Sequence, residues 1–372
     1  MPAASFARRR ISTAELLGRD EQIVYGDAAH RLIADSVVLV TGAGGSIGSE
    51  LVRQLIQLRA KAVFMLDHDE GALHALQLEL VGHGLLDDST VVLGNVRDLD
   101  SLTRIFRRIE PDIVFHAAAH KHLPLLERFP SEGVKTNVLG SHNVAIAAAR
   151  AGVSRLVNVS TDKAASPTSV LGATKRFAEE LAVSEGNEHL RVANVRFGNV
   201  LGSRGSFLDS LAYQLDNELP ITITDEAVTR YFMTIPEAAG LVIEAAVMAE
   251  PGATYILDMG EPVRILDLAR SFARLAGVAD PEIAFTGLRP GEKLHEELLD
   301  SSEVQLPTDH PRIFRAEGVG LPSIAADRLP LLTMAAEAGD DALVRRLLLG
   351  TNDEMPILMV PEPRATAELI GA

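Results

Sequence analysis

"SVVLVTGAGGSIGSELVRQL", residues 36–55, is the stretch of sequence that decides the fold. Residues 36–42 form a β-branched apolar run that ends in glycine, which is typical of a buried strand. Apolar residues then recur with helical spacing from residue 46 to about residue 60. Between these two parts lies TGAGGSIG, residues 41–48, with the spacing TGxxGxxG. A strand, a glycine-rich turn and a helix in this order predict a phosphate-binding turn.

Each of the three spaced glycines has its own physical reason. Gly42 lets the chain turn off the strand, and Gly48 permits close packing of the helix on the sheet. Gly45 lets the backbone approach a pyrophosphate at the helix N-terminus, where free N–H groups and the helix dipole favour anions. Asp67 ends the next strand about 20 residues further on, where this fold contacts a ribose. A carboxylate there repels a 2′-phosphate, so NAD is favoured over NADP.

Strands and helices continue to alternate beyond this unit. Further strands are predicted at residues 62–67, 89–96, 112–119, 155–160 and 191–197, and further helices at residues 70–80, 133–152 and 172–182. Such alternation implies a parallel sheet with right-handed crossovers, covered by helices on both faces. The predicted fold class is α/β, with a Rossmann-type doubly wound parallel sheet and a smaller C-terminal substrate-binding lobe.

The pattern divides the chain into four segments. Residues 1–35 are an N-terminal extension with a short helix near residues 12–17, and residues 36–200 are the NAD-binding domain, to which later elements return. Residues 201–315 form mainly the substrate-binding lobe, and residues 316–372 are a helical C-terminal segment. Elements expected after residue 200 are strands at 219–225 and 253–260 and helices at 235–249, 265–277, 334–338 and 341–348.

Composition narrows the class of function. The 372 residues carry a net charge of −16, so nucleic acid and anionic membranes are not expected partners. Cysteine is absent, which excludes disulfides and thiolate chemistry. The N-terminus has no apolar run after its basic residues, and no stretch reaches the roughly 18 apolar residues of a membrane span. We therefore expect a cytoplasmic protein without a membrane span.

Polar residues follow the fifth predicted strand directly. Ser160, Thr161, Asp162 and Lys163 stand at its carboxyl end, which is the edge where ligands bind in an open α/β sheet. Alone, STDK would be an ordinary polar loop with Asp162 as a helix cap. Its place in the sheet instead predicts a hydroxyl, an acid and an amine beside the cofactor.

Other polar residues near strand ends allow two interpretations each. Asp98 either borders the adenine or caps the following helix. Lys121, after the fourth strand, is expected to contact the cofactor or a sugar. The histidines at positions 116, 120 and 122 have no acid cluster beside them, so no metal site is predicted.

Six motifs, in this order, resemble the extended short-chain dehydrogenase/reductase superfamily. They are TGAGGSIGSELVRQL, HAAAHKHLPLLE, NVSTDKAASPTSVLGATKR, RFGNVLGSRGS, RYFMTIPEA and LRPGEKLHEELL. More narrowly, the set resembles the UDP-N-acetylglucosamine 4,6-dehydratases of the polysaccharide-biosynthesis group, which makes capsule and flagellin glycans. The Thr-Asp-Lys triplet and the RPGEKLHEEL segment are the discriminating motifs. Many members carry an N-terminal membrane half, and this chain resembles the short soluble forms.

The resemblance implies a reaction and a set of residue roles. In this family hydride passes from C4 of the hexose to NAD⁺, the C5 proton and the C6 hydroxyl are removed, and hydride returns to C6. It implies Asp162 as the acid, Lys163 as the base, Thr161 on the C4 oxygen and Lys175 on the nicotinamide ribose. A neutral Lys163 requires a lowered pKa, which we expect burial and the charge of Lys175 to supply. The predicted cofactor contacts are Gly42, Gly45, Ser46, Ile47, Gly48, Asp67, Asp98, Ala117, Ala118, Lys121 and Lys175.

Leu171 departs from the superfamily plan. It stands four residues before Lys175, where relatives carry Met or a Tyr that exchanges the hydroxyl proton. Leucine is close in volume to Met and carries no proton, so we expect the C4 proton to leave through ordered water or Thr161. A non-catalytic NAD- or sugar-nucleotide-binding protein is the alternative that Leu171 supports. A UDP-sugar 4- or 5-epimerase is another, although simple 4-epimerisation relies on the missing Tyr.

The resemblance also implies a UDP-sugar substrate. An acidic protein that binds a diphosphate needs local cations, and guanidinium groups match phosphate geometry. The predicted substrate contacts are Asn199, Arg204, Arg230, Arg289 and Glu292, with Glu292 on the uridine ribose. A surface ion pair is the alternative role for each arginine. Because family members form homo-oligomers, a dimer or hexamer is expected, with the Ala-rich helix at residues 143–151 in its interface.

Overall fold

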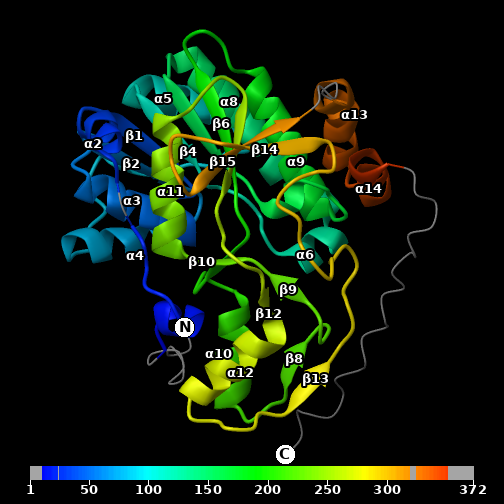
Figure 1. Ribbon diagram of the computed structural model, residues 1–372. Helices are drawn as coiled ribbons and strands as arrows, with labels where there is room; N and C mark the ends of the chain where they lie inside the picture. The colour runs from blue at the N-terminus through cyan, green and yellow to red at the C-terminus, as the bar shows by residue number, and fades with distance from the viewer. Residues whose placement is uncertain (1–10, 24, 319–323, 351–372) are drawn as a thin grey trace, which may run out of the picture.

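The computed structural model describes residues 11–23, 25–318 and 324–350, and the remainder of the predicted N-terminal extension and C-terminal segment lies outside the described residues. The described residues form a nine-stranded sheet (Figure 1). In spatial order its strands are β14 (Glu303–Pro307), β15 (Ile313–Gly318), β11 (Ala253–Leu257), β6 (Arg191–Arg196), β5 (Arg155–Val159), β4 (Ile113–His116), β1 (Val37–Thr41), β2 (Ala62–Asp67) and β3 (Val91–Leu93). All neighbouring pairs from β3 to β11 are parallel, whereas β15 is antiparallel to both β11 and β14. The Rossmann-type doubly wound sheet is therefore confirmed.

Helices cover both faces of the sheet, each over its own apolar core. One face is covered by α2 (Asp27–Ala34), α3 (Ser46–Gln57), α4 (Glu70–Val81) and α11 (Ile235–Val247). The other face is covered by α5 (Leu99–Ile109), α8 (Gly140–Ala151) and α9 (Val170–Ser184). Leu51 and Ile243 are fully buried on the first face, and Phe106 and Val144 on the second. This two-sided burial explains why the parallel strands read as continuous apolar runs.

The helix predicted at residues 133–152 contains a π-helical segment. α7 (Pro130–Gly133), η2 (Val134–Leu139) and α8 follow one another without a break, and η2 is the π-helical part. Such segments are rare and often lie at functional sites. Asn137 of η2 is fully buried, accepts from the backbone N of His120 (2.8 Å) and donates to its carbonyl oxygen (3.0 Å). This pair of hydrogen bonds fixes the loop that follows β4.

A separate lobe lies below the sheet in Figure 1. It pairs β7 (Asn199–Leu201) with β10 (Phe232–Thr234), β8 (Ile221–Ile223) with β13 (Ile283–Phe285), and β9 (Thr229–Arg230) with β12 (Val263–Arg264). α10 (Phe207–Asp216) and α12 (Ile265–Leu275) supply most of its apolar core. α1 (Thr13–Leu17), the short helix predicted in the extension, adds Leu16 to that core. The N-terminal segment is thus part of the packed structure.

The structure differs from the prediction mainly at the edge of the sheet. The β14–β15 hairpin was not expected, and it returns residues 303–318 to the sheet, so the predicted boundary at residue 315 falls inside β15. Most of β14 is exposed or half-buried, which leaves no apolar run to detect. α2 was also not expected, although its Ala29 and Ile33 are fully buried.

The predicted C-terminal helices are present as α13 (Ile324–Ala338) and α14 (Asp341–Leu349). They pack against α7, η2 and α9, beside α6 (Leu123–Arg128) (Figure 1). Leu332, Ala336 and Val344 are fully buried in this contact. The apolar cluster there also contains Leu171, so the C-terminal helices help to pack the helix that carries the site.

A buried ion-pair cluster joins the sheet, α9 and the hairpin. Arg196 of β6 is 1% exposed and donates to both carboxylate oxygens of Glu179 on α9 (2.8 and 2.7 Å). Its Nη1 donates to Glu303 of β14 (2.7 Å). Glu179 also accepts from Ser160 Oγ (2.6 Å), immediately before the predicted catalytic triplet. The cluster therefore connects sheet stability with the position of the site.

Glu179→Ala is expected to destabilise the fold by about 3–5 kcal/mol, because it leaves the buried Arg196 guanidinium without its bidentate partner. Urea unfolding followed by circular dichroism measures the loss. Glu250→Gln is the control, since it removes a largely exposed partner of Arg315, and we expect about 0–1 kcal/mol. Equal losses in the two variants would contradict the role given to the cluster.

Candidate active site

A cavity of about 1250 Å³ lies between the carboxyl ends of the parallel strands and the lobe. Loops that follow β1 to β6 form one side, and β7, β8, α10 and residues 286–292 contribute to the other. This is the edge at which open α/β sheets bind ligands. Predicted site residues that line it are Gly42, Gly45, Ser46, Ile47, Asp67, Ala117, Ala118, Lys121, Thr161, Lys163, Lys175, Asn199, Arg204, Arg230, Arg289 and Glu292. Gly48, Asp98 and Asp162 are outside its wall.

The glycine-rich turn has the geometry expected for a phosphate site. Gly42 has φ of +71°, and a Cβ there would lie 2.5 Å from the backbone N of Ala118. A Cβ at Gly48 would lie 2.0 Å from the carbonyl oxygen of Gly42, so Gly48 acts through packing and not through contact with the cavity. Gly45 caps α3 without a side-chain hydrogen bond, which leaves the first N–H groups of the helix for a ligand. A dinucleotide pyrophosphate fits these residues.

The two acids predicted near the adenosine have different positions. Asp67 lines the cavity; its Oδ2 accepts from Gly44 N (2.9 Å), and its Oδ1 accepts from Asp69 N (3.0 Å). These bonds fix the carboxylate at the end of β2. Asp98 caps α5 by accepting from Ser101 N (2.9 Å), so the cap, and not the adenine contact, is the role that the structure supports.

The loop after β4 brings basic groups to the cavity. Lys121 Nζ donates to Ser203 Oγ of the lobe (3.2 Å). Burial, and secondarily the charge of Arg204, lowers the pKa of Lys121. Arg204 in turn donates its backbone N–H to Ser46 Oγ (3.0 Å), which places this part of the lobe directly on the phosphate turn. Two cations, Lys121 and Arg204, therefore lie near the turn.

The nearby histidines have a structural explanation. His116 is buried and makes hydrogen bonds with Thr41 Oγ1 (2.6 Å) and Ser141 Oγ (2.8 Å). Burial, aided by the charge of Lys175, lowers the pKa of His116 to about 3, so the ring is neutral. Within residues 11–23, 25–318 and 324–350 no three His, Asp or Glu side chains are grouped as metal ligands.

The Thr161–Asp162–Lys163 triplet forms the first turn after β5, with η3 at Asp162–Ala164. Asp162 is 1% exposed, and its Oδ1 accepts from Thr161 Oγ1 (2.8 Å), Lys163 N (2.9 Å) and Lys163 Nζ (2.9 Å). Its Oδ2 is buried and has no hydrogen-bond partner among the described residues. A Cβ at Gly198, a residue of the cavity wall, would lie 3.2 Å from that oxygen. Thr161 and Lys163 are thus on the wall, and the Asp162 carboxyl lies just behind it.

The predicted lowering of the Lys163 pKa is wrong. Burial favours the neutral amine, but the charges of Asp162 and Glu296 outweigh it and raise the pKa of Lys163. The expectation failed because it left out the charge of the adjacent Asp162, which raises the pKa most, and that of Glu296, which lies 3.5 Å from Lys163 Nζ. Lys163 is therefore an ammonium group that pairs with the Asp162 carboxylate.

Lys175 and Leu171 lie one helical turn apart on α9, and both line the cavity. Lys175 Nζ donates to the carbonyl oxygen of Val159 (2.6 Å). Burial, opposed by the charge of Glu179, lowers the pKa of Lys175 to about 8. Leu171 is buried among the apolar residues under α13 and α14, so no proton carrier occupies the position of the superfamily Tyr.

The lobe arginines differ in how free they are to bind phosphate. Arg230 is buried and donates to the carbonyl oxygens of Thr229 (2.7 Å) and Leu294 (3.1 Å) and to Glu292 (3.0 Å). Arg230 lines the cavity, but these contacts hold its guanidinium, and its role as a phosphate contact stays a prediction. Arg289 is about half exposed on the cavity wall and pairs with Glu292 at 3.1 Å, so it fits a phosphate contact better.

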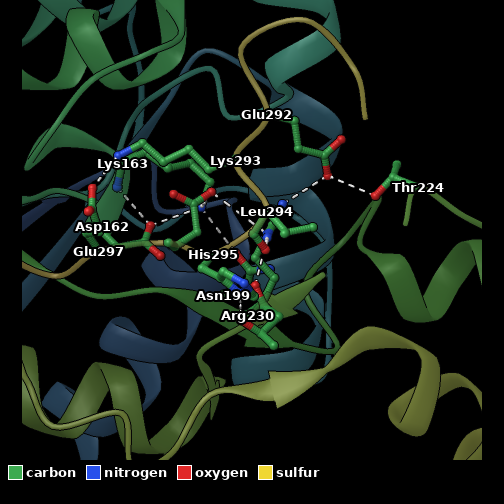
Figure 2. A network of polar contacts seen from close by, with 12 residues as sticks. Asp162, Lys163, Asn199, Thr224, Arg230, Glu292, Lys293, Leu294, His295 and Glu297 are labelled. Carbon is green, nitrogen blue, oxygen red and sulfur yellow. Dashed lines mark hydrogen bonds and ion pairs between the residues drawn. The ribbon is translucent and has the colours of Figure 1, made fainter. Parts of the chain in front are cut away.

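The sequence interpretation missed Glu296, the second acid of the LRPGEKLHEELL motif. Its carboxylate lies 3.5 Å from Lys163 Nζ and 3.8 Å from Arg230 Nε. Asn199 Oδ1 also accepts from Lys163 Nζ (3.5 Å), and Figure 2 shows the surrounding network. The sequence gives no signal that separates Glu296 from the exposed Glu297 beside it.

The sheet, the phosphate turn and the lobe over the strand ends define a nucleotide-binding α/β protein with a Rossmann-type fold. The chain belongs to the family described as "Polysaccharide biosynthesis protein", whose model matches residues 38–318. It is 44% identical to a probable polysaccharide biosynthesis protein, EpsC, of Bacillus subtilis, over 84% of this chain and 53% of that protein. The chain thus spans about half the length of this relative.

A second relative is the UDP-N-acetylglucosamine 4,6-dehydratase (inverting) of Campylobacter jejuni, which is 33% identical over 72% of this chain and 79% of that protein. Among solved structures, Pen from Bacillus thuringiensis has a TM-score of 0.68 and 33% identity, over 78% of this chain and 89% of its own. MoeE5 in complex with UDP-glucuronic acid and NAD has a TM-score of 0.58 and 27% identity, over 70% and 88%. In the part of the chain that the structure describes, no helix is long and apolar enough to cross a membrane.

Asp67→Asn is expected to weaken NAD binding about tenfold, because the amide loses a charged acceptor for the ribose hydroxyls. Asp98→Ala is the matched control: it should cost about 1 kcal/mol of stability through loss of the α5 cap and leave NAD affinity unchanged. Titration calorimetry and thermal unfolding measure the two effects. Weaker NAD binding in Asp98→Ala would instead place that carboxylate on the adenosine.

Proposed function

We propose that this chain is an NAD-dependent nucleotide-sugar 4,6-dehydratase that acts on UDP-N-acetylglucosamine and gives a 4-keto-6-deoxy sugar nucleotide. The observation that carries the proposal is the Lys163 amine on the cavity wall, bonded at 2.9 Å to the buried Asp162 carboxylate. An acid and a base side by side are what removal of water across C5 and C6 requires. Family membership and the relative named as a UDP-N-acetylglucosamine 4,6-dehydratase support the same reaction.

NAD is the proposed cofactor because the residues present fit it. Gly42, Gly45 and Ser46 would hold the pyrophosphate at the start of α3, and Asp67 would accept from the adenosine ribose. Lys175 would hold the nicotinamide ribose. Bound NAD supplies the hydride acceptor and donor for the sugar. MoeE5, which is 27% identical, contains NAD in its solved structure.

The acid and the base share one proton in this proposal. In the structure the proton stays on Lys163, because Asp162 and Glu296 raise the pKa of Lys163 despite its burial. Transfer along the 2.9 Å hydrogen bond to Asp162 gives a neutral amine and a carboxylic acid. The amine then takes the C5 proton, and the acid protonates the C6 hydroxyl, which leaves as water. The pair is then back in its ionic state. When hydride returns to C6, Lys163 would give a proton back to C5, and the proton released from the C4 hydroxyl would restore the charge of the pair, so no net proton is exchanged with solvent.

The substrate diphosphate is expected near the lobe cations. Arg204 and Arg289 line the cavity, and Lys121 adds a third positive charge near the phosphate turn. Within a chain of net charge −16, these groups provide the local positive field that an anionic substrate needs. Glu292, fixed by Arg230 and Arg289, remains the proposed partner of the uridine ribose.

An epimerase is the second candidate. The UDP-glucose 4-epimerase of Rickettsia felis is 30% identical over 75% of this chain and 82% of that protein. Leu171 argues against simple 4-epimerisation, since that reaction relies on the Tyr of the superfamily. Proton NMR of the product separates the two, because only dehydration converts the C6 hydroxymethyl group to a methyl group.

Incubation with UDP-N-acetylglucosamine is expected to give a product lighter by one water, without net NADH. Lys163→Ala should lower turnover at least about 100-fold, because the base at C5 is lost, and should retain bound NAD. Mass spectrometry of the product and absorbance of bound cofactor check both. The exposed Lys61→Ala is the control. Wild-type turnover in Lys163→Ala would exclude Lys163 as the base.

Leu171→Tyr is expected to leave dehydration possible, because the acid and the base lie elsewhere. The larger ring in a buried site should cost about 1–3 kcal/mol of stability, whereas the matched Leu171→Met should cost less than about 1.5 kcal/mol. Activity of all three proteins, measured beside their unfolding curves, tests this. If only the Tyr variant were active, the natural chain would be a binding protein.

A further inference from the structure

Glu296 is a buried carboxylate to which none of the roles above assigns a function. Its side chain is 4% exposed, and Oε1 lies 3.5 Å from Lys163 Nζ. The same oxygen lies 3.8 Å from Arg230 Nε. Lys163 follows strand β5 of the sheet, whereas Glu296 comes from the segment after β13 of the lobe. Two distant parts of the sequence therefore converge on one amine.

We propose that Glu296 is a positioning residue that holds the Lys163 ammonium and sets how readily Lys163 passes its proton to Asp162. The proposal rests on the acid and base roles proposed above for Asp162 and Lys163. Glu296 does not line the cavity, so it acts through Lys163 and not on the sugar.

The charges around the amine give Glu296 this control. Lys163 faces two carboxylates, Asp162 and Glu296, and the cation Arg230. With Glu296 ionised, the ammonium form of Lys163 is stabilised and proton transfer to Asp162 is opposed. With Glu296 neutral, one of the two carboxylates stops holding the proton on Lys163. The charge on Glu296 therefore affects how readily the proton moves from Lys163 to Asp162.

Opposing groups act on the pKa of Glu296. Burial and the charge of Asp162 raise its pKa, whereas Lys163, Arg230 and Lys293 lower it, and the net direction is upward. Arg230 cannot move away to follow the charge, because backbone carbonyls and Glu292 hold its guanidinium (Figure 2). Glu296 therefore lies between a fixed cation, Arg230, and the Lys163 ammonium, whose proton moves in the proposed reaction.

The chemical reactivity of Lys163 tests the proposal without any sugar. The full chain with NAD bound is treated with acetic anhydride over a series of pH values, and acetylation of Lys163 is read by peptide mass spectrometry. Only the neutral amine reacts. Glu296→Gln should move half-maximal labelling of Lys163 to lower pH, because one carboxylate that holds its proton is gone. An unchanged labelling profile in Glu296→Gln would overturn the proposal.

Two further variants separate charge from structure. Glu297→Gln, the matched control, alters an exposed neighbour that pairs with Lys293 and should leave the profile unchanged. Glu296→Asp keeps the charge but withdraws it by one methylene, so it should shift the profile in the same direction by less. It keeps the proposal falsifiable if Glu296→Gln fails to fold, since an unshifted Glu296→Asp profile would then contradict it.

Activity provides the second readout. The acid limb of kcat/KM for UDP-N-acetylglucosamine should move to lower pH in Glu296→Gln, which a purely structural role would not cause. A labelling shift in a protein that never dehydrates this sugar would refute the proposed function alone. Dehydration by the natural chain with an unshifted labelling profile would refute the role of Glu296 alone.

Discussion

The buried pair of Arg196 and Glu179 is the interaction on which the site depends. A guanidinium and a carboxylate removed from water must each satisfy the other, and here the carboxylate also accepts from Ser160 and the guanidinium reaches Glu303. The pair therefore fixes three things together: the loop that enters the catalytic triplet, the helix that carries Lys175, and the β14–β15 hairpin at the sheet edge. Chemistry at the strand ends needs positions held this firmly.

The cations of the cavity occupy two different electrostatic environments. Lys121 and Arg204 lie near the phosphate turn, which suits an anionic ligand. Deeper in the wall, Lys163 is balanced by Asp162 and Glu296, which suits proton movement without a change in net charge. In the proposed function, Lys121 and Arg204 would bind the anionic substrate and Lys163 would move a proton within the same cavity.

The sequence predicted the regular parts well because each had a local cause. β2 was predicted with the bounds that the structure has, and the glycine turn lies where its spacing required. Thr161 and Lys163 of the proposed catalytic triplet lie at the cavity edge because parallel strands share their carboxyl ends. The raised pKa of Lys163 follows first from the adjacent Asp162, whose charge the sequence shows. The additional contribution of Glu296 and the pairing of Arg230 with Glu292 could not be predicted. Those acids lie more than a hundred residues from Lys163, and no local pattern shows which acid of a motif is buried.

The absence of a Tyr at Leu171 affects only one step of the proposed reaction, the departure of the C4 hydroxyl proton. The residue is held in an apolar cluster with the C-terminal helices, so this part of α9 is built for packing and not for proton exchange. Thr161 donates its own hydrogen to Asp162 Oδ1 and accepts from Lys163 N (3.4 Å), which leaves one oxygen lone pair to accept from a sugar hydroxyl at the cavity wall. In the proposed reaction, a sugar hydroxyl at this wall would reach the Asp162 carboxyl through Thr161, because Asp162 itself lies behind the wall. Such a relay would carry the C4 proton without a Tyr on α9.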